Sequence, residues 1–248
     1  MKLVIANWKC NPATQEEAER FFDMIEERTK KLGKIRNLKI VICPPFVWLS
    51  GLRGEIPNLR LGGQDCHWEQ SGAYTGEVSP KMLKDLGCDY VIVGHSERRE
   101  YFNETNEIIN KKLLAALKTR LKPILCVGEK EDEEMGLIIK NQLIEGLKAV
   151  NRIQMQNIII AYEPVWAIGT KNPCQPDDAM RAALFIRKIL NELYNRKLAE
   201  ETAIIYGGSV NSKIVLSYIK EAGMDGLLIG KASLDISEFI KIIEQVNG

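Results

Sequence analysis

Two side chains able to transfer protons lie where short apolar segments of the chain end. Glu163 closes the apolar segment 158–163, and His95 follows Gly94 at the end of another. A carboxylate at the end of a buried segment must be paired, solvated or reactive, because burying it unpaired costs several kcal/mol. We therefore treat Glu163 as a candidate base and His95 as a candidate proton donor.

His95 also precedes a predicted helix that begins at Ser96-Glu97-Arg98-Arg99. The amino terminus of a helix carries a partial positive charge, which opposes protonation of a nearby imidazole. His95 would then stay neutral and donate a hydrogen bond. A histidine that only caps the helix fits the same position equally well, so its location alone does not assign its role.

An apolar loop, 164–170, follows Glu163 and is bounded by Pro164 and Pro173. Loops usually run over the protein surface, where an apolar segment is unusual. We interpret this loop as a lid that covers a ligand. The alternative is a loop packed permanently on the protein beneath it.

Glycines at Gly207-Gly208-Ser209 and at Gly230 precede predicted helices. Backbone amides and the helix dipole at such points can hold a phosphate without a charged side chain. The formal net charge of the chain is only +1, which gives no broad field for nucleic acid or an anionic membrane, so anion recognition must be local. Tight turns alone would also explain these glycines.

Other clusters of polar residues do not predict a metal or cofactor site. Asp65-Cys66-His67 contains metal-binding residue types, but contiguous side chains rarely converge on one ion, so we interpret it as a loop. The acidic stretch 129–134 is typical of the start of a solvated helix, where only Glu129 could face a site. We expect no metal and no cofactor.

The elements that must position these residues are short β-rich segments that alternate with helical ones along the whole chain. This alternation predicts a parallel sheet with crossover helices. Most of the segments are continuously apolar, as expected of strands buried on both faces. We place eight strands at 3–8, 38–43, 59–64, 90–94, 123–127, 158–163, 203–206 and 226–229.

Eight strand–helix units can form a closed (β/α)8 barrel or an open doubly wound sheet. The first turn lacks the GxGxxG pattern of the open sheet, and 248 residues match the usual size of the barrel. We therefore predict one α/β domain over 1–248, a closed barrel of eight parallel strands surrounded by helices. The polar residues that follow strands would then meet at one rim, and they are Asn7, Lys9, Gln64, His95, Glu129, Glu163, Ser209 and Lys231.

Several helices carry signals for where they begin. Thr14 and Glu17 match a capping box, in which the two side chains satisfy end amides reciprocally. Pro80 and Pro176 each stand where a helix can begin, because the missing N–H would be unpaired there. The helix after Pro176 is predicted to bury an apolar stripe made of Ala179, Ala182, Ala183, Ile186, Ile189, Leu190 and Leu193.

The six cysteines are scattered without CxxC pairs, which indicates free thiols in a reducing compartment. The apolar run at the amino terminus is too short for a signal peptide, and no segment approaches the roughly 18 apolar residues of a membrane span. We expect a cytoplasmic protein with no membrane or nucleic-acid partner.

Six ordered blocks, spread over essentially the whole chain, resemble the signatures of the triosephosphate isomerase family. They lie at 7–9 (NWK), 72–79 (GAYTGEVS), 93–99 (VGHSERR), 126–129 (CVGE), 161–170 (AYEPVWAIGT) and 206–210 (YGGSV). The resemblance implies a TIM barrel and an enzyme of glycolysis and gluconeogenesis. Its substrates would be dihydroxyacetone phosphate and D-glyceraldehyde 3-phosphate, and it would need no cofactor.

Carried onto this sequence, the resemblance implies that Glu163 removes a proton from the carbon beside the carbonyl, which leaves an enediolate. Neutral His95 would polarise the carbonyl and move protons between the two oxygens. Lys9 would supply fixed positive charge, and Asn7 would help to orient the substrate.

The resemblance also implies which residues bind the substrate. Four positions match those whose backbone amides hold its phosphate, namely Gly169, Ser209, Gly230 and Lys231. Ile168 and Leu228 would clamp the base when the lid shuts, and the exclusion of water would suppress loss of phosphate from the enediolate. Ser96 and Glu97 are expected to support the site.

The loop 72–79 resembles the family's dimer loop, which reaches into a partner subunit. The resemblance therefore implies a homodimer, in which Thr75 lies near Asn7 and Lys9 of the other copy.

The chain departs from the family pattern at the far hinge of the lid. Lys171-Asn172-Pro173-Cys174 stand where Gly-Lys-Thr-Ala is common, and a proline there fixes one φ angle. Lys231 replaces a usual glycine, although its N–H remains available, and the segment 129–143 is shorter than usual. Two alternatives stay open, namely another phosphosugar aldose–ketose isomerase with a larger substrate, and an inactive barrel used as an interaction protein.

Overall fold

The computed structural model describes residues 1–32, 35, 37–52, 56, 58–169 and 173–248, and its strands close into a barrel in chain order. Each strand is parallel to its neighbours, and β1 pairs with both β2 and β8, so the described sheet has no open edge. The strands are β1 (Lys2–Asn7), β2 (Leu38–Cys43), β3 (Leu59–Gly63), β4 (Cys88–Val93), β5 (Lys122–Val127), β6 (Ile159–Tyr162), β7 (Ile204–Tyr206) and β8 (Gly226–Ile229). The predicted closed barrel is confirmed, and the open doubly wound sheet is excluded.

Successive residues of a strand point to opposite faces of the sheet. Leu3 and Ile5 belong to the apolar cluster inside the barrel, whereas Val4 and Ala6 belong to the larger cluster that the strands form with the helices. Both faces of the sheet are thus apolar, which explains the continuous apolar runs in the sequence. The predicted bounds of 38–43 and 226–229 match β2 and β8, and each of the other strands differs by one or two residues at one or both ends.

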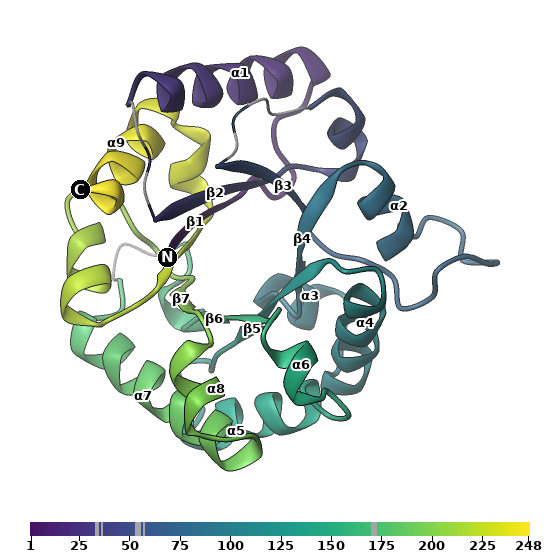
Figure 1. Ribbon diagram of the computed structural model, residues 1–248, viewed down its shortest axis with the longest axis vertical. Coiled ribbons are helices and arrows are strands. Elements are labelled where there is room, and N and C mark those ends of the chain that lie inside the picture. The colour runs from purple at the N-terminus through teal and green to yellow at the C-terminus, as the bar shows by residue number, and fades with distance from the viewer. Residues whose placement is uncertain (33–34, 36, 53–55, 57, 170–172) are drawn as a thin grey trace.

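Helices form a ring around the strands (Figure 1). They are α1 (Gln15–Lys31), α2 (Pro80–Asp85), α3 (Ser96–Tyr101), α4 (Asn106–Lys118), α5 (Met135–Gly146), α6 (Arg152–Met155), α7 (Pro176–Leu193), α8 (Arg196–Glu201) and α9 (Ile236–Asn247). Short 3-10 or π-helical segments lie at η1 (Phe46–Gly51), η2 (Val165–Ala167), η3 (Ser217–Glu221) and η4 (Lys231–Leu234). None of the described helices combines the length and apolar character needed to cross a bilayer.

The helix starts follow the predicted signals in most cases. Pro80 and Pro176 are the first residues of α2 and α7. Thr14 caps α1 by accepting a hydrogen bond from the Glu17 amide, which is one half of the predicted capping box. A complete capping box occurs instead at α6, between Asn151 and Gln154, where the pattern was not predicted.

Two predictions about helices are wrong in detail. The apolar stripe of α7 is buried from Ala179 to Leu190, but Leu193 is 40% exposed because it is the last residue of the helix and lies beyond the packed face. The acidic stretch 129–134 precedes α5, which begins at Met135, so these carboxylates form a turn and an N-cap position.

The segment between β3 and α2 extends away from the barrel (Figure 1). Residues 72–77 are all exposed, and Gly72 and Gly76 adopt positive φ angles of 138° and 91°. Only glycine adopts such angles without strain, so these two residues shape the turn of this protruding loop.

Candidate active site

The barrel brings the predicted catalytic residues to one rim. Asn7 and Glu163 lie two residues beyond Ile5 and Ala161, which both face the barrel interior, so the alternation of the strands directs them to its mouth. A cavity of about 530 Å³ opens there. Its lining includes Asn7, Lys9, His95, Glu163, Ile168, Gly169, Ser209, Leu228, Gly230 and Lys231.

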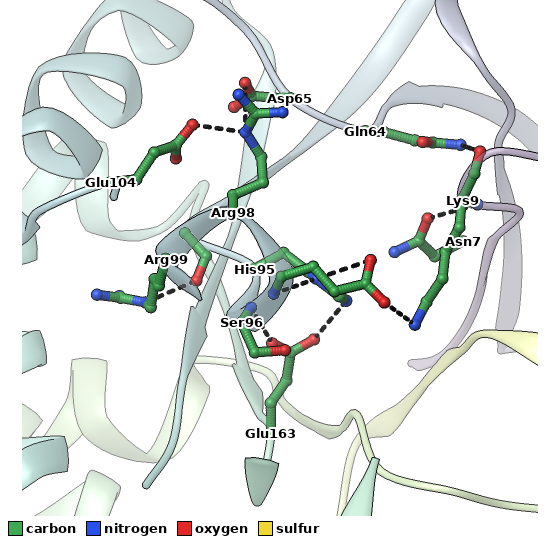
Figure 2. Close-up of polar contacts among 12 residues, drawn as sticks. Asn7, Lys9, Gln64, Asp65, His95, Ser96, Arg98, Arg99, Glu104 and Glu163 are labelled. Atoms are coloured by element: carbon green, nitrogen blue, oxygen red, sulfur yellow. Dashed lines mark hydrogen bonds and ion pairs between the residues drawn. The ribbon is translucent and has the colours of Figure 1, made fainter. Parts of the chain in front are cut away.

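Glu163 is almost completely buried, at 2% exposed, and it faces neutral groups (Figure 2). Its Oε2 accepts a hydrogen bond of 3.1 Å from the Ser96 amide. Its Oε1 lies 3.2 Å from His95 Nε2, but outside hydrogen-bond geometry, so this oxygen has no hydrogen-bond partner among the described residues. A buried carboxylate oxygen without a partner is available to accept a proton.

His95 is the N-cap residue of α3, and its Nδ1 accepts a hydrogen bond of 3.2 Å from the Glu97 amide. A ring nitrogen that accepts from an N–H carries no proton, so this contact places the imidazole proton on Nε2. The imidazole is therefore neutral and presents an N–H donor to the cavity. The histidine therefore caps the helix through one nitrogen and faces Glu163 with the other, and its role as a proton donor stays a prediction.

Lys9 is held above the cavity by three polar side chains. Its backbone adopts a left-handed φ of 54°, which is uncommon outside glycine. Its amide donates to Asn7 Oδ1 at 3.0 Å, and its carbonyl accepts from Gln64 Nε2 at 2.8 Å. Its Nζ lies 2.5 Å from Glu97 Oε1. These contacts fix a positive charge at the cavity that Glu163 and His95 also line.

Backbone amides gather on the other side of the cavity. The Gly169 amide donates to Ser209 Oγ at 3.1 Å, which joins the segment after β6 to the turn after β7. Gly230 and Lys231 follow β8, and Lys231 begins η4. Amides at such turns are suited to an anion such as phosphate.

Two glycines make room for Glu163. A Cβ at Gly207 would lie 2.8 Å from Glu163 Cγ, and one at Gly128 would lie 1.9 Å from the Glu163 carbonyl oxygen. No other residue fits at Gly128 without moving the backbone that carries Glu163.

Glu129 lies beneath the start of the apolar loop and not in the cavity lining. Its Oε1 accepts hydrogen bonds from Tyr162 and from the Trp166 indole, both at 3.0 Å. Burial and the Glu129 charge raise the pKa of Tyr162, so this phenol remains a donor. Glu129 therefore anchors the near end of the loop through Trp166.

The other predicted residues have mixed outcomes. Thr75 lies on the exposed loop, outside the cavity of its own chain, and its place near Asn7 and Lys9 of a second copy stays a prediction. Asp65-Cys66-His67 is a loop, as predicted, and no metal-ligand cluster occurs among the described residues. Thr170, Lys171 and Asn172, which include part of the altered hinge, lie outside the described residues.

The main role that the sequence did not assign is that of Gln64. Its amide nitrogen donates to the carbonyls of Lys9 and Cys43, which fixes the unusual backbone of Lys9. The available signal was its position directly after a predicted strand.

Comparison with known proteins gives one consistent result. A family model described as triosephosphate isomerase matches residues 2–246. Proteins of that name from Dictyoglomus turgidum and Aquifex aeolicus are each 44% identical over 248 residues, which cover 98% of this chain and 98% of the relative. One from Alkaliphilus oremlandii is 41% identical over 247 residues, covering 97% and 98%. The similarity thus extends along the barrel and the site together.

Proposed function

We propose, from the premise that this chain belongs to the triosephosphate isomerase family, that Glu163 is the base and His95 the proton donor of its reaction. The chain is an isomerase that interconverts dihydroxyacetone phosphate and D-glyceraldehyde 3-phosphate. The observation that supports the assignment is the buried Glu163 oxygen without a hydrogen-bond partner, facing a neutral imidazole 3.2 Å away.

Glu163 removes a proton from the carbon beside the substrate carbonyl, and the C–H electrons move into an enediolate. The Ser96 amide holds the second oxygen of the carboxylate, so the group cannot rotate freely while it accepts the proton. His95 Nε2–H donates to the carbonyl oxygen, where negative charge develops, and then transfers protons between the two substrate oxygens.

Lys9 stabilises the negative charge of the enediolate and of the phosphate, because its ammonium is fixed by Glu97 at the edge of the same cavity. Asn7 orients the substrate from the end of β1, where it is buried and holds the Lys9 amide. The phosphate is held by the amides of Gly169, Ser209, Gly230 and Lys231, and the first two exchange their partners Ser209 Oγ and Ala167 O for the phosphate.

The apolar loop acts as a lid over this chemistry. Ile168 and Leu228 line the cavity together with Glu163, so they clamp the base when the loop covers the substrate. Exclusion of water strengthens the interactions of charges in the site and limits elimination of phosphate from the enediolate.

A homodimer through 72–79, with Thr75 near Asn7 and Lys9 of the second copy, also belongs to this proposal. Five of the eleven large exposed apolar residues among those described follow the neighbouring strands β2, β3 and β4, and they are Val47, Tyr74, Met82, Tyr101 and Phe102. Association of two copies can bury exposed apolar groups of this kind. Light scattering should give twice the 28.1 kDa mass of one chain, and a Tyr74→Glu variant should shift toward monomer.

The proposal takes 1–248 as one domain and places it in the cytoplasm. The barrel begins at Lys2 and α9 ends at Asn247, so the elements of the barrel run through the whole chain. All six cysteines are free, as expected of a reducing compartment.

Isotope exchange tests the reaction and the base together. The protein is incubated with dihydroxyacetone phosphate in heavy water, while deuterium at carbon one and formation of the aldehyde are followed. We expect both signals, because a proton removed by Glu163 exchanges with solvent before it is returned. Folded protein that gives neither signal would refute the assignment.

A further inference from the structure

The end of the lid segment farther from Glu163 is held by a buried tyrosine that the reaction chemistry does not use. Tyr218 is 1% exposed, and its hydroxyl donates a hydrogen bond of 2.5 Å to the Cys174 carbonyl. Cys174 immediately precedes Gln175, the N-cap residue of α7. Tyr218 itself lies in the π-helical segment η3, a geometry that often marks functional sites.

Tyr218 also contacts the strand that carries the phosphate turn. Its ring stacks on that of Tyr206, the last residue of β7, with 4.0 Å between centroids and 9° between planes. The Tyr206 hydroxyl lies so close to Gly208 that a Cβ there would be 2.1 Å away. Contacts therefore run from Cys174 through the two tyrosines to Gly208, next to Ser209.

The two phenols stay protonated over the neutral range. Burial raises the pKa of Tyr206 and of Tyr218 above the ordinary value for tyrosine. The Tyr218 hydroxyl is therefore a permanent donor to the Cys174 carbonyl, and the contact does not depend on pH near 7.

We propose that Tyr218 is a positioning residue that ties the far end of the lid, at Cys174, to the phosphate-binding turn at Ser209. The lid is then attached to this turn directly, by hydrogen bonds of Ser209 with Gly169 and Ala167, and indirectly through Cys174 and Tyr218. The inference rests on the proposed function, because it assigns the phosphate to Ser209 and the lid to the apolar loop.

The hydroxyl of Tyr218 distinguishes this role from simple packing. A phenylalanine would fill the same space and stack on Tyr206, so a residue that only packs would tolerate the replacement. A residue that positions Cys174 would not, since the hydrogen bond to its carbonyl would be lost.

The first test is Tyr218→Phe, with Tyr194→Phe as the matched control on a half-buried tyrosine just after α7. We expect KM for D-glyceraldehyde 3-phosphate and the inhibition constant of inorganic phosphate both to rise about 3- to 10-fold, as for one lost buried hydrogen bond. The change in kcat should be smaller, and more of the enediolate should lose phosphate per turnover. Values equal to those of wild type and Tyr194→Phe would overturn the proposal.

The second test uses hydrogen exchange. Its first measurement needs only the wild-type protein, so it does not depend on the folding of a variant. In the wild-type protein, inorganic phosphate should slow amide exchange in 164–169 and in 173–180 together, and Tyr218→Phe should lose the second effect. If phosphate does not slow amide exchange in 173–180 of the wild-type protein, the proposed role of Tyr218 is wrong. If wild-type protein shows this exchange pattern but no isomerase activity, the proposed function fails and the tie stands.

Discussion

Two buried groups of charged and polar residues lie on either side of α3, and the carboxylates in them have different partners (Figure 2). One is the active site around Glu163. The other is an ionic cluster formed by Asp65, Arg98, Glu104 and Lys112, of which Lys112 is only 3% exposed. His95 caps α3 on the side of the active site, and Arg98 extends from the same helix into the ionic cluster.

In the ionic cluster each carboxylate faces both cations. Lys112 Nζ lies 2.6 Å from Asp65 and 2.5 Å from Glu104, and Arg98 Nε lies 2.8 Å and 2.5 Å from the same two groups. Glu163 is equally buried but faces an amide and a neutral imidazole. The comparison shows that burial alone does not distinguish Glu163 from the structural carboxylates. Among the described residues Glu163 has no cation in contact, unlike Asp65 and Glu104, and it lines the cavity, unlike Glu129, which is also buried without a cation in contact.

The largest expected effect comes from removing the charge of the unpaired carboxylate. Glu163→Gln should lower kcat by roughly 10³- to 10⁴-fold, because the base is lost while the site keeps its shape. Inhibition by inorganic phosphate should change less than about twofold, since the anion-binding amides are untouched. The free energy of unfolding should be unchanged or slightly higher, because a buried charge without a cation partner is removed.

Steady-state assays and urea unfolding measure these quantities, and Glu244→Gln, at an exposed carboxylate of α9, is the control. Normal turnover in Glu163→Gln would mean that the base lies elsewhere. A large loss of stability would instead place Glu163 with the structural carboxylates, and the contrast between the two regions would disappear.

The sequence predicts the barrel well because the residue types of each strand reflect the burial of its two faces. Both faces of β1, β2 and β6 are largely buried, so these strands are mostly apolar and recognisable without a partner. The convergence of Asn7 and Glu163 also follows, since strand ends meet at one rim of a closed parallel barrel. Leu193 was mispredicted because periodicity does not show where the packed face of a helix ends.

The details of the site depend on contacts between distant segments, which no local pattern encodes. The proton position on His95 is set by the Glu97 amide, and the left-handed φ of Lys9 is held by Gln64, 55 residues away. Tyr218 reaches Cys174 across 44 residues, and its segment carries no motif. Such contacts arise only once the barrel has closed.

A substitution in the ionic cluster should lower activity less than Glu163→Gln does, but it should lower stability strongly. Lys112→Met should lower the free energy of unfolding by about 3–5 kcal/mol, because it leaves Asp65 and Glu104 buried with one cation fewer. The neighbouring Lys111→Met removes only an exposed pair with Glu107 and should leave the free energy of unfolding nearly unchanged. Urea unfolding at one fixed protein concentration measures both. If Lys112→Met lowered kcat as much as Glu163→Gln does, the ionic cluster and the active site would not act independently.

The smallest effect concerns the pKa of Asp65, on which burial and the adjacent cations act in opposite directions. Burial raises the pKa of Asp65 to about 6, against the opposing effect of Lys112 and Arg98. The folded protein then holds this proton more tightly than the unfolded chain, in which an aspartate titrates near 3.9. Folding therefore takes up a proton between about pH 4 and 6, and the contribution of Asp65 to stability grows as the pH falls through that window.

Asp65→Asn, which cannot titrate, isolates this contribution from all other groups. The unfolding free energy of wild type minus that of Asp65→Asn should increase between pH 7 and pH 4.5, by at most about 3 kcal/mol. Urea unfolding of both proteins across this range measures the difference. If it decreases on acidification, Asp65 is stabilised as a charge and pairing with Lys112 and Arg98 outweighs burial. Charge pairing would then stabilise the ionic cluster, whereas Glu163 faces the Ser96 amide and His95.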